Sequence, residues 1–81
     1  MRVVTEIPHP QYKLTVFAWN NKYLLKVETP MYEQTYKIGE TDLTGDDDIK
    51  SIVADEEFMQ SVMLRFNEMN ESWKKALEKV M

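Results

Sequence analysis

The clearest pattern in the first half of the chain is an alternation of apolar and polar positions. It covers residues 11–19 and 22–29, and the two segments are separated by Asn20-Asn21. Successive side chains of a strand point to opposite faces of a sheet, so each segment predicts a strand with one buried face. Asparagine tolerates a positive φ better than most residues, so the asparagine pair predicts a tight hairpin turn.

The alternation also predicts how these strands pair. A two-residue loop brings each residue of the more apolar set opposite another member of that set, whereas a slip of one residue would mix the two faces. We therefore expect a single register. Its pairs are Trp19 with Lys22, Phe17 with Leu24, Thr15 with Lys26, Lys13 with Glu28, Ala18 with Tyr23, Val16 with Leu25 and Leu14 with Val27.

Further segments extend the predicted sheet on both sides. Residues 32–38 alternate in the same way and follow a turn signal at Thr29-Pro30, so they predict the third strand of an antiparallel meander. Residues 3–7 favour either a fourth strand or an extended lead-in. Because proline cannot donate a hydrogen bond to a sheet, Pro8 and Pro10 restrict this N-terminal segment to the edge.

The second half of the chain has the periodicity of helices. Residues 47–54 predict a short helix that Thr44 or Asp46 can cap. Residues 56–80 predict a longer helix, because apolar residues recur at steps of three and four. Asn70 can cap a restart, so a break there is an alternative to one continuous helix. The apolar face consists of Phe58, Val62, Phe66, Met69, Trp73, Leu77 and Val80.

These elements predict a single α+β domain over residues 1–81. A three-stranded antiparallel meander, which a fourth strand at the N-terminus can extend, occupies about residues 11–39, and the helices of about residues 46–80 pack on one face of the sheet. A helix of about 25 residues is about 37 Å long, which is more than three strands can cover. This excess length favours either the break at Asn70 or a larger assembly.

Composition narrows the class of protein. The chain has 81 residues, no cysteine and a net charge of −4. A core of this size supplies only about 3–5 kcal/mol, and disulfides and cysteine-based zinc sites are excluded, so self-association is expected. No apolar run approaches the length of a secretory signal or a membrane span. We therefore expect a small acidic protein of the cytoplasm with no membrane contact.

The negative charge is concentrated in one region. Residues 40–57 carry −7, which leaves +3 on the rest of the chain. Acidic residues of segment 42–48 have the alternate spacing of calcium ligands, but Asp47 and Val53 replace the glycine and glutamate that an EF-hand requires. We interpret the segment as a solvated loop whose acids cap a helix, with a weak divalent-cation site as the alternative.

Residues able to carry enzyme chemistry are scarce. His9 is the only histidine and lies between prolines, without a second histidine or a cysteine to share a metal. The serines lie on the predicted helices rather than in a glycine-rich elbow, and Gly39 and Gly45 match no phosphate-binding loop. We therefore expect no enzyme, no cofactor and no metal site.

The most informative surface is the second face of the sheet. The helices can cover one face, and the other then presents Phe17, Trp19 and Leu24 together, although a solvated sheet face should be polar. One interpretation is that another part of the chain covers this patch. The candidates are the N-terminal arm with Val3, Val4 and Ile7, and the end of the long helix with Trp73, Leu77 and Val80.

A second interpretation is that a second copy or another protein covers the patch, because aromatic residues within a polar rim are typical of interface centres. This is our leading hypothesis: a non-enzymatic protein–protein interaction module, expected as a homodimer, that uses Phe17, Trp19 and Leu24. The third interpretation is single-stranded nucleic-acid binding on the same face, which the net charge opposes. The lysines concerned are Lys22, Lys26 and Lys37, with Lys13 beside them.

Several short segments scattered over most of the chain also carry a resemblance. They are Ile7-Pro8-His9-Pro10, Trp19-Asn20, Glu33-Gln34-Thr35-Tyr36-Lys37 and Arg65-Phe66. With them the chain resembles an uncharacterised family of short bacterial proteins without assigned function. The segments are not catalytic signatures, so the resemblance implies no activity, cofactor or site.

Overall fold

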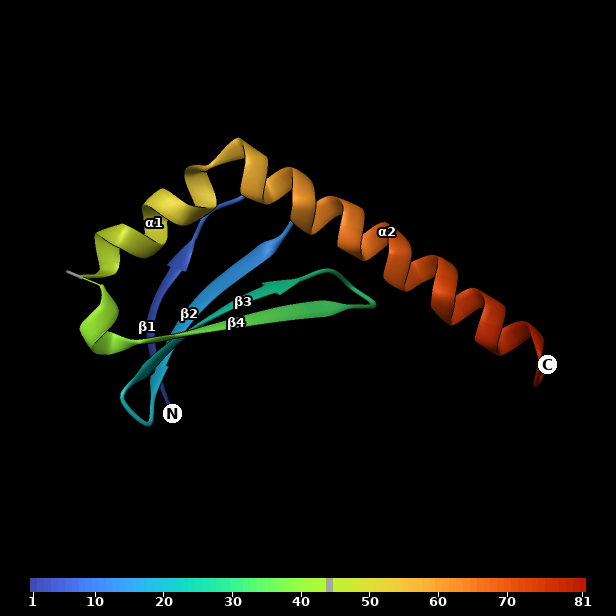
Figure 1. The fold of residues 1–81 in the computed structure, drawn as a ribbon, viewed down its shortest axis with the longest axis horizontal. Helices are drawn as coiled ribbons and strands as arrows, with labels where there is room; N and C mark the ends of the chain where they lie inside the picture. The colour runs from blue at the N-terminus through green and yellow to red at the C-terminus, as the bar shows by residue number, and fades with distance from the viewer. Residues whose placement is uncertain (44) are drawn as a thin grey trace.

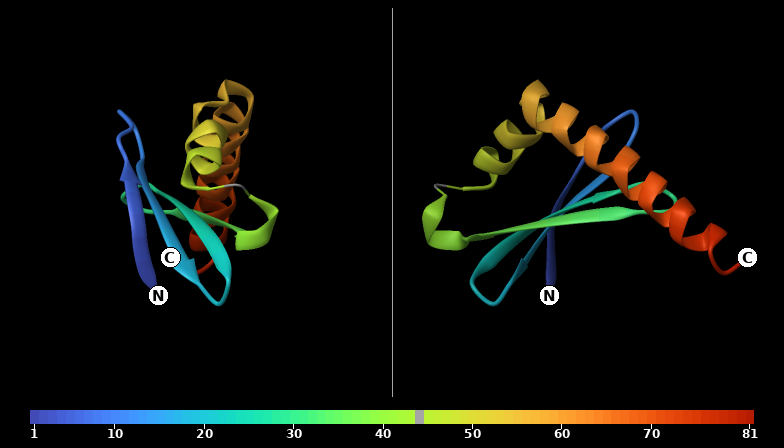
Figure 2. Two further views of the ribbon diagram at one scale, coloured as in Figure 1. Left: turned by 90° about the vertical axis from the view of Figure 1, so that its left-hand side faces the viewer. Right: turned by 45° about the vertical axis from the view of Figure 1, so that its right-hand side comes forward.

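The computed structural model describes residues 1–43 and 45–81. Within them, an antiparallel sheet of four strands in chain order is followed by two α-helices, and both helices lie on one face of the sheet (Figure 1, Figure 2). This confirms the predicted α+β fold, with the N-terminal segment as a full edge strand. The elements are β1 (Arg2–Ile7), β2 (Lys13–Trp19), β3 (Lys22–Glu28), β4 (Glu33–Gly39), the 3₁₀ turn η1 (Glu40–Asp42), α1 (Asp46–Ala54) and α2 (Glu56–Glu78).

The hairpin of β2 and β3 has the register that the sequence predicts for each of its pairs. Asn20 and Asn21 have φ values of 53° and 60°. Two successive residues with positive φ form the mirror-image turn whose twist matches that of the flanking strands. The asparagine pair therefore sets the length of the loop, and this length determines which side chains share a face.

β1 lies at the edge of the sheet beside β2, and its pairing shifts between Val3 and Thr5. The irregularity has the effect of a β-bulge, which redirects the side chains that precede it. Val4 packs against the core, whereas Val3 pairs with Phe17 on the opposite face of the sheet. The N-terminal strand thus contributes side chains to both faces.

His9 organises the connection between β1 and β2. Its Nδ1 atom accepts hydrogen bonds from the backbone amides of Gln11 and Tyr12, at 3.1 and 3.2 Å. The imidazole ring also stacks on the ring of Tyr12, with centroids 5.1 Å apart. His9 lies between two prolines, and these contacts give it a structural role in the turn that joins β1 to β2.

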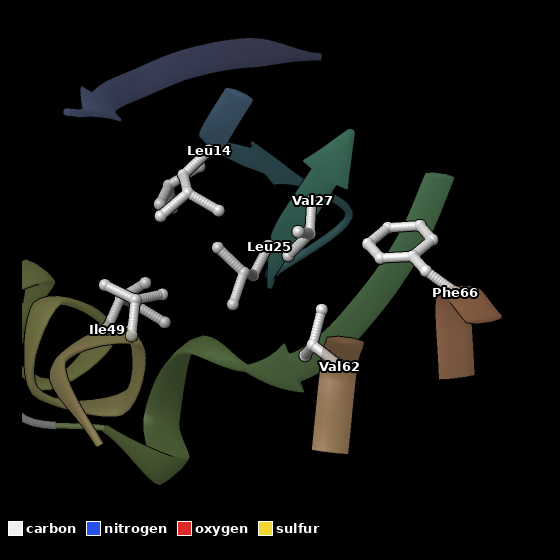
Figure 3. Close-up of a cluster of buried hydrophobic side chains, with 8 residues drawn as sticks. Leu14, Leu25, Val27, Ile49, Val62 and Phe66 are labelled. Atoms are coloured by element: carbon white, nitrogen blue, oxygen red, sulfur yellow. The ribbon is translucent and has the colours of Figure 1, made fainter. Parts of the chain in front are cut away.

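The hydrophobic core lies between the sheet and the helices (Figure 3). The strands supply it from alternate positions, and each helix supplies one face, as the periodicity predicts. Complete burial of one such aliphatic side chain contributes about 1.5–3 kcal/mol. The buried cluster consists of Leu14, Val16, Leu25, Val27, Ile49, Val53, Val62 and Phe66.

Polar side chains on the inner face of β4 also hold α2. Gln34 donates from Nε2 to the carbonyl oxygen of Val62 at 2.9 Å and accepts a hydrogen bond from the Tyr36 hydroxyl. Arg65 donates from Nη1 to the same hydroxyl at 3.0 Å, and the Tyr36 ring meets Phe58 edge-on. Both ends of the Gln34 amide are therefore satisfied, as a half-buried polar group requires.

α2 is one continuous helix from Glu56 to Glu78, so the break considered at Asn70 does not occur. At about 1.5 Å per residue it is about 35 Å long, whereas a seven-residue strand spans about 23 Å. Its C-terminal half therefore extends past the end of the sheet, as Figure 1 shows. The Cα atoms of the molecule extend 47 Å along its longest axis.

The helix starts differ from the predicted caps. α1 begins at Asp46 directly after Gly45, which occupies the capping position and has no side chain to bond with. Asp46 is thus the first helical residue rather than the cap, and the predicted cap Thr44 lies outside the described residues. α2 is capped by Asp55, whose side chain accepts a hydrogen bond from the amide of Glu57 at 3.1 Å.

Candidate interaction surface on the outer sheet face

The outer face is the face of the sheet that points away from α1 and α2 (Figure 2). The register is uninterrupted from β2 to β4, and β1 pairs with β2 on both sides of its irregularity, so the side chains of this face form rows that cross the strands. From the β1–β2 loop toward the Asn20-Asn21 turn, the rows are Lys13, Glu28 and Glu33; then Glu6, Thr15, Lys26 and Thr35; then Val3, Phe17, Leu24 and Lys37; and finally Trp19 and Lys22.

The apolar part of the outer face lies toward the Asn20-Asn21 turn. Trp19 is 47% exposed and Val3 is 57% exposed, whereas Leu24 is only 6% exposed. Leu24 lies on a central strand between Phe17 and Lys37, so side chains of its own sheet cover it. Leu24 therefore forms the floor of the patch, and Trp19 and Val3 provide its accessible apolar surface.

Neither segment that the sequence offers as a cover lies over the outer face in the described part of the chain. β1 lies beside β2 within the sheet, so it extends the patch by adding Val3. α2 starts over the inner face, and its C-terminal half extends past the end of the sheet instead of folding over the outer face (Figure 1, Figure 2). The patch around Trp19 is therefore open in the single chain.

The charges of the outer face are partly neutralised within the chain. Glu28 and Glu33 are direct cross-strand neighbours, and the Nζ atom of Lys26 lies 3.7 Å from Oε1 of Glu28 and 3.3 Å from Oε2 of Glu33. Like charges opposite each other destabilise a sheet, so Lys26 offsets this repulsion. Its charge is consequently less available to an external ligand than the sequence suggests.

The other lysines of this face are free of such contacts. Lys13, Lys22 and Lys37 form no ion pair within residues 1–43 and 45–81. Lys22 and Lys37 lie in the two rows nearest the Asn20-Asn21 turn, beside the apolar patch. The structure thus brings together Trp19, Phe17, Lys22 and Lys37. Lys26 lies in the neighbouring row, but its charge is engaged by Glu28 and Glu33.

Thr15 lies in the middle of the outer face and was not singled out by the sequence. It is 3% exposed, and its hydroxyl oxygen has no hydrogen-bond partner among the described residues. Burial of a hydroxyl without a partner costs about 1–3 kcal/mol. The alternation gives no signal for this, because threonine at an outward position is normally solvated.

A second open surface lies where α2 leaves the sheet. A groove of about 900 Å³ separates the turn after β3, at Met31 and Tyr32, from Met69 and Trp73 of α2. Met31 and Trp73 are 75% and 51% exposed. The sequence indicates this groove only through the helix, which is predicted to be longer than the sheet. It gives no signal for Met31, because this residue lies in a turn that has no periodic pattern. None of the residues that line the groove belongs to the rows of the outer face.

The described residues contain no group of three or more histidine, cysteine, aspartate or glutamate side chains placed to hold a metal ion. In the same residues, α2 is long enough to cross a bilayer but too polar, and no other helix qualifies.

Comparison with protein-family models, curated proteins and solved structures finds no match. The resemblance to an uncharacterised bacterial family therefore stays a prediction.

Proposed function

We propose that this protein is a non-enzymatic interaction module whose outer face binds a second copy of the chain. The observation that carries the proposal is the 47% exposure of Trp19 on a sheet face where Leu24 and Thr15 are buried. A tryptophan on a sheet face beside Val3 and Phe17 has the composition of an interface core, and the lysines and glutamates around it supply a polar rim. A chain with so small a core also gains stability from association.

The size of the face sets the expected strength. Four strands spaced about 4.8 Å apart, each about 23 Å long, give a footprint of about 450 Å² per copy. Standard interfaces bury about 800 Å² of accessible surface per partner. A single sheet face with this projected footprint belongs to the small end of that range, so we expect weak binding. We therefore expect a dimer that dissociates in the micromolar range, with a Kd of about 10–100 μM.

Single-stranded nucleic acid is the alternative ligand for the same face. Phe17 and Trp19 offer stacking surfaces, and Lys22 and Lys37 lie beside them. The two glutamates around Lys26 oppose this alternative, because they cancel one of the few positive charges on the face. Affinity for a phosphate backbone grows with the number of phosphates neutralised, and here that number is small.

Sedimentation equilibrium tests the proposal. The weight-average mass should rise with concentration from 9.6 kDa toward twice that value. Trp19→Asp should hold the mass at that of a monomer, because it replaces the exposed aromatic side chain of the interface with a charge. Trp73→Asp is the matched control, since Trp73 is also half-exposed but belongs to α2 and not to the outer face.

Circular dichroism of both variants must show the wild-type fold for this comparison to apply. A wild-type mass that stays at 9.6 kDa up to about 500 μM would rule out the dimer, since specific interfaces bind more tightly than that. Anisotropy of a labelled oligonucleotide at low salt separates the alternative. If the oligonucleotide binds the wild-type chain but not Trp19→Asp, and the wild-type chain is a monomer, the result would favour nucleic acid as the ligand of this face.

A further inference from the structure

The two central strands carry complementary side chains in matching rows of the outer face. Phe17 of β2 lies opposite Leu24 of β3, so apolar faces apolar. In the neighbouring row Trp19 lies opposite Lys22, which pairs an aromatic ring with a cation. At the other end of the strands Lys13 lies opposite Glu28, which pairs opposite charges. The β2 half of the face is therefore complementary to its β3 half.

A surface with this property is self-complementary under one particular twofold rotation. We infer that the second copy docks face to face, with the twofold axis parallel to the strands and between β2 and β3. The inference rests on the proposed function and specifies how the partner is held. Each β2 then lies over β3 of the second copy with the rows in register, and packed sheets keep their strands within about 30° of each other.

This arrangement gives a carboxylate partner to a lysine that forms no ion pair in the single chain's described residues. That lysine is Lys13, whose cross-strand neighbour Glu28 lies 3.7 Å from Lys26. Across the axis, Lys13 meets Glu28 of the second copy, twice per dimer. Trp19 meets Lys22 of the second copy, where an ammonium group over an indole face is favourable.

The perpendicular twofold axis gives a poorer match. It would lie across the strands, between the row of Thr15 and the row of Phe17, and would exchange the two ends of the face. This axis also gives an ion pair and a cation–aromatic contact, because Glu28 would lie over Lys22 and Lys13 over Trp19. The two axes therefore differ in the central rows, where Thr15 would lie over Phe17 and Lys26 over Leu24. This places a charge that is held by two glutamates onto an apolar floor, which costs desolvation without a new partner.

A pair of charge-reversal variants tests the arrangement. In Lys13→Glu homodimers both intermolecular contacts join two carboxylates, and in Glu28→Lys homodimers both join two ammonium groups. In a mixed dimer of the two variants both contacts join opposite charges. At low ionic strength we expect each variant alone to dimerise about tenfold more weakly than the wild type and the equimolar mixture to recover most of that loss.

Mixing isolates the contact between chains. Within one chain the substitution places like charges side by side on β2 and β3, and this repulsion is the same in the homodimer and in the mixed dimer. Recovery on mixing, measured by sedimentation and by native mass spectrometry of isotope-labelled chains, therefore reports the intermolecular pair alone. Circular dichroism of each variant checks that the fold is retained.

Val3→Glu provides a second test that does not involve β2 or β3. Val3 lies over Lys37 of the second copy when the axis is parallel to the strands, so dimerisation should tighten by about threefold to tenfold at low salt. With the perpendicular axis Val3 lies over Glu6, and the same substitution should weaken the dimer. Val3 is 57% exposed at the sheet edge, so the change perturbs the fold little.

The outcomes separate the inference from the proposed function. A wild-type dimer whose charge-reversal variants do not recover on mixing would overturn the parallel axis and leave the outer face as the interface. Weakening by Val3→Glu would overturn it as well. A wild-type chain that remains monomeric in the same experiments would overturn both the axis and the proposed function.

Discussion

The hydroxyl of Tyr32 donates a hydrogen bond of 3.0 Å to Oδ1 of Asn70, which joins the turn between β3 and β4 to α2 at the point where the helix leaves the sheet. The two residues are 38 positions apart in the sequence. Asparagine in the middle of a helix is locally unfavourable, and the bond to Tyr32 offsets this cost. A capping signal at Asn70 thus becomes an anchor for a continuous helix.

Removal of this anchor should loosen the second half of α2. We expect Tyr32→Phe to lower the free energy of unfolding by about 1 kcal/mol, measured by urea denaturation. Asn70→Ala should lower it by less, because alanine regains up to about 0.7 kcal/mol of helix propensity. The double variant should lose less than the sum of the two, because both substitutions remove the same bond. Fully additive losses would show that the two side chains do not interact in solution.

Thr15 offers a stabilising substitution. Its side chain is buried on the outer face with a hydroxyl that lacks a partner among the described residues. Thr15→Val keeps the branched shape and removes the cost of burying that hydroxyl, so the free energy of unfolding should rise by about 1 kcal/mol. Thr15→Ser, which keeps the hydroxyl and loses the methyl group, is the control and should be destabilising. A loss of stability in Thr15→Val would mean that the hydroxyl is satisfied.

His9 should matter for stability rather than for chemistry. Because its Nδ1 atom accepts two backbone hydrogen bonds, His9→Ala leaves the amides of Gln11 and Tyr12 without that acceptor. We expect a loss of about 1–2 kcal/mol in the free energy of unfolding. His9→Asn keeps a side-chain acceptor and should lose less. Equal losses in both variants would argue that stacking on Tyr12, not the acceptor, holds the turn.

The hairpin shows what local sequence can predict. Alternation fixes which residues share a face, and Asn20-Asn21 fixes the loop at two residues, so the register of β2 and β3 follows without tertiary information. The bulge in β1 does not follow, because Val3 and Val4 are both apolar and an alternation cannot choose between them. The partners of Gln34, the Val62 carbonyl and the Tyr36 hydroxyl, likewise depend on how α2 crosses the sheet.

The outer face was predictable in position but not in detail. The pattern correctly places Phe17, Trp19 and Leu24 side by side on one face of the sheet. It gives all three equal weight, whereas the structure buries Leu24 and leaves Trp19 half exposed. The difference arises because a residue on a central strand is covered by neighbours on both sides, and Trp19 lies at the end of a strand. The pattern also does not predict that Lys26 pairs with Glu28 and Glu33, because these contacts depend on the conformation of the lysine side chain.

Amide NMR spectra recorded during dilution from about 1 mM to about 10 μM test the proposed dimer most directly, because this range spans the expected Kd. The dimer predicts concentration-dependent shifts for Val3, Phe17, Trp19 and Lys22 on the outer face. It also predicts constant shifts for Trp73 and Leu77, which belong to the half of α2 that extends past the end of the sheet. Spectra that do not change with concentration, or changes confined to α2, would contradict an interface on the outer face.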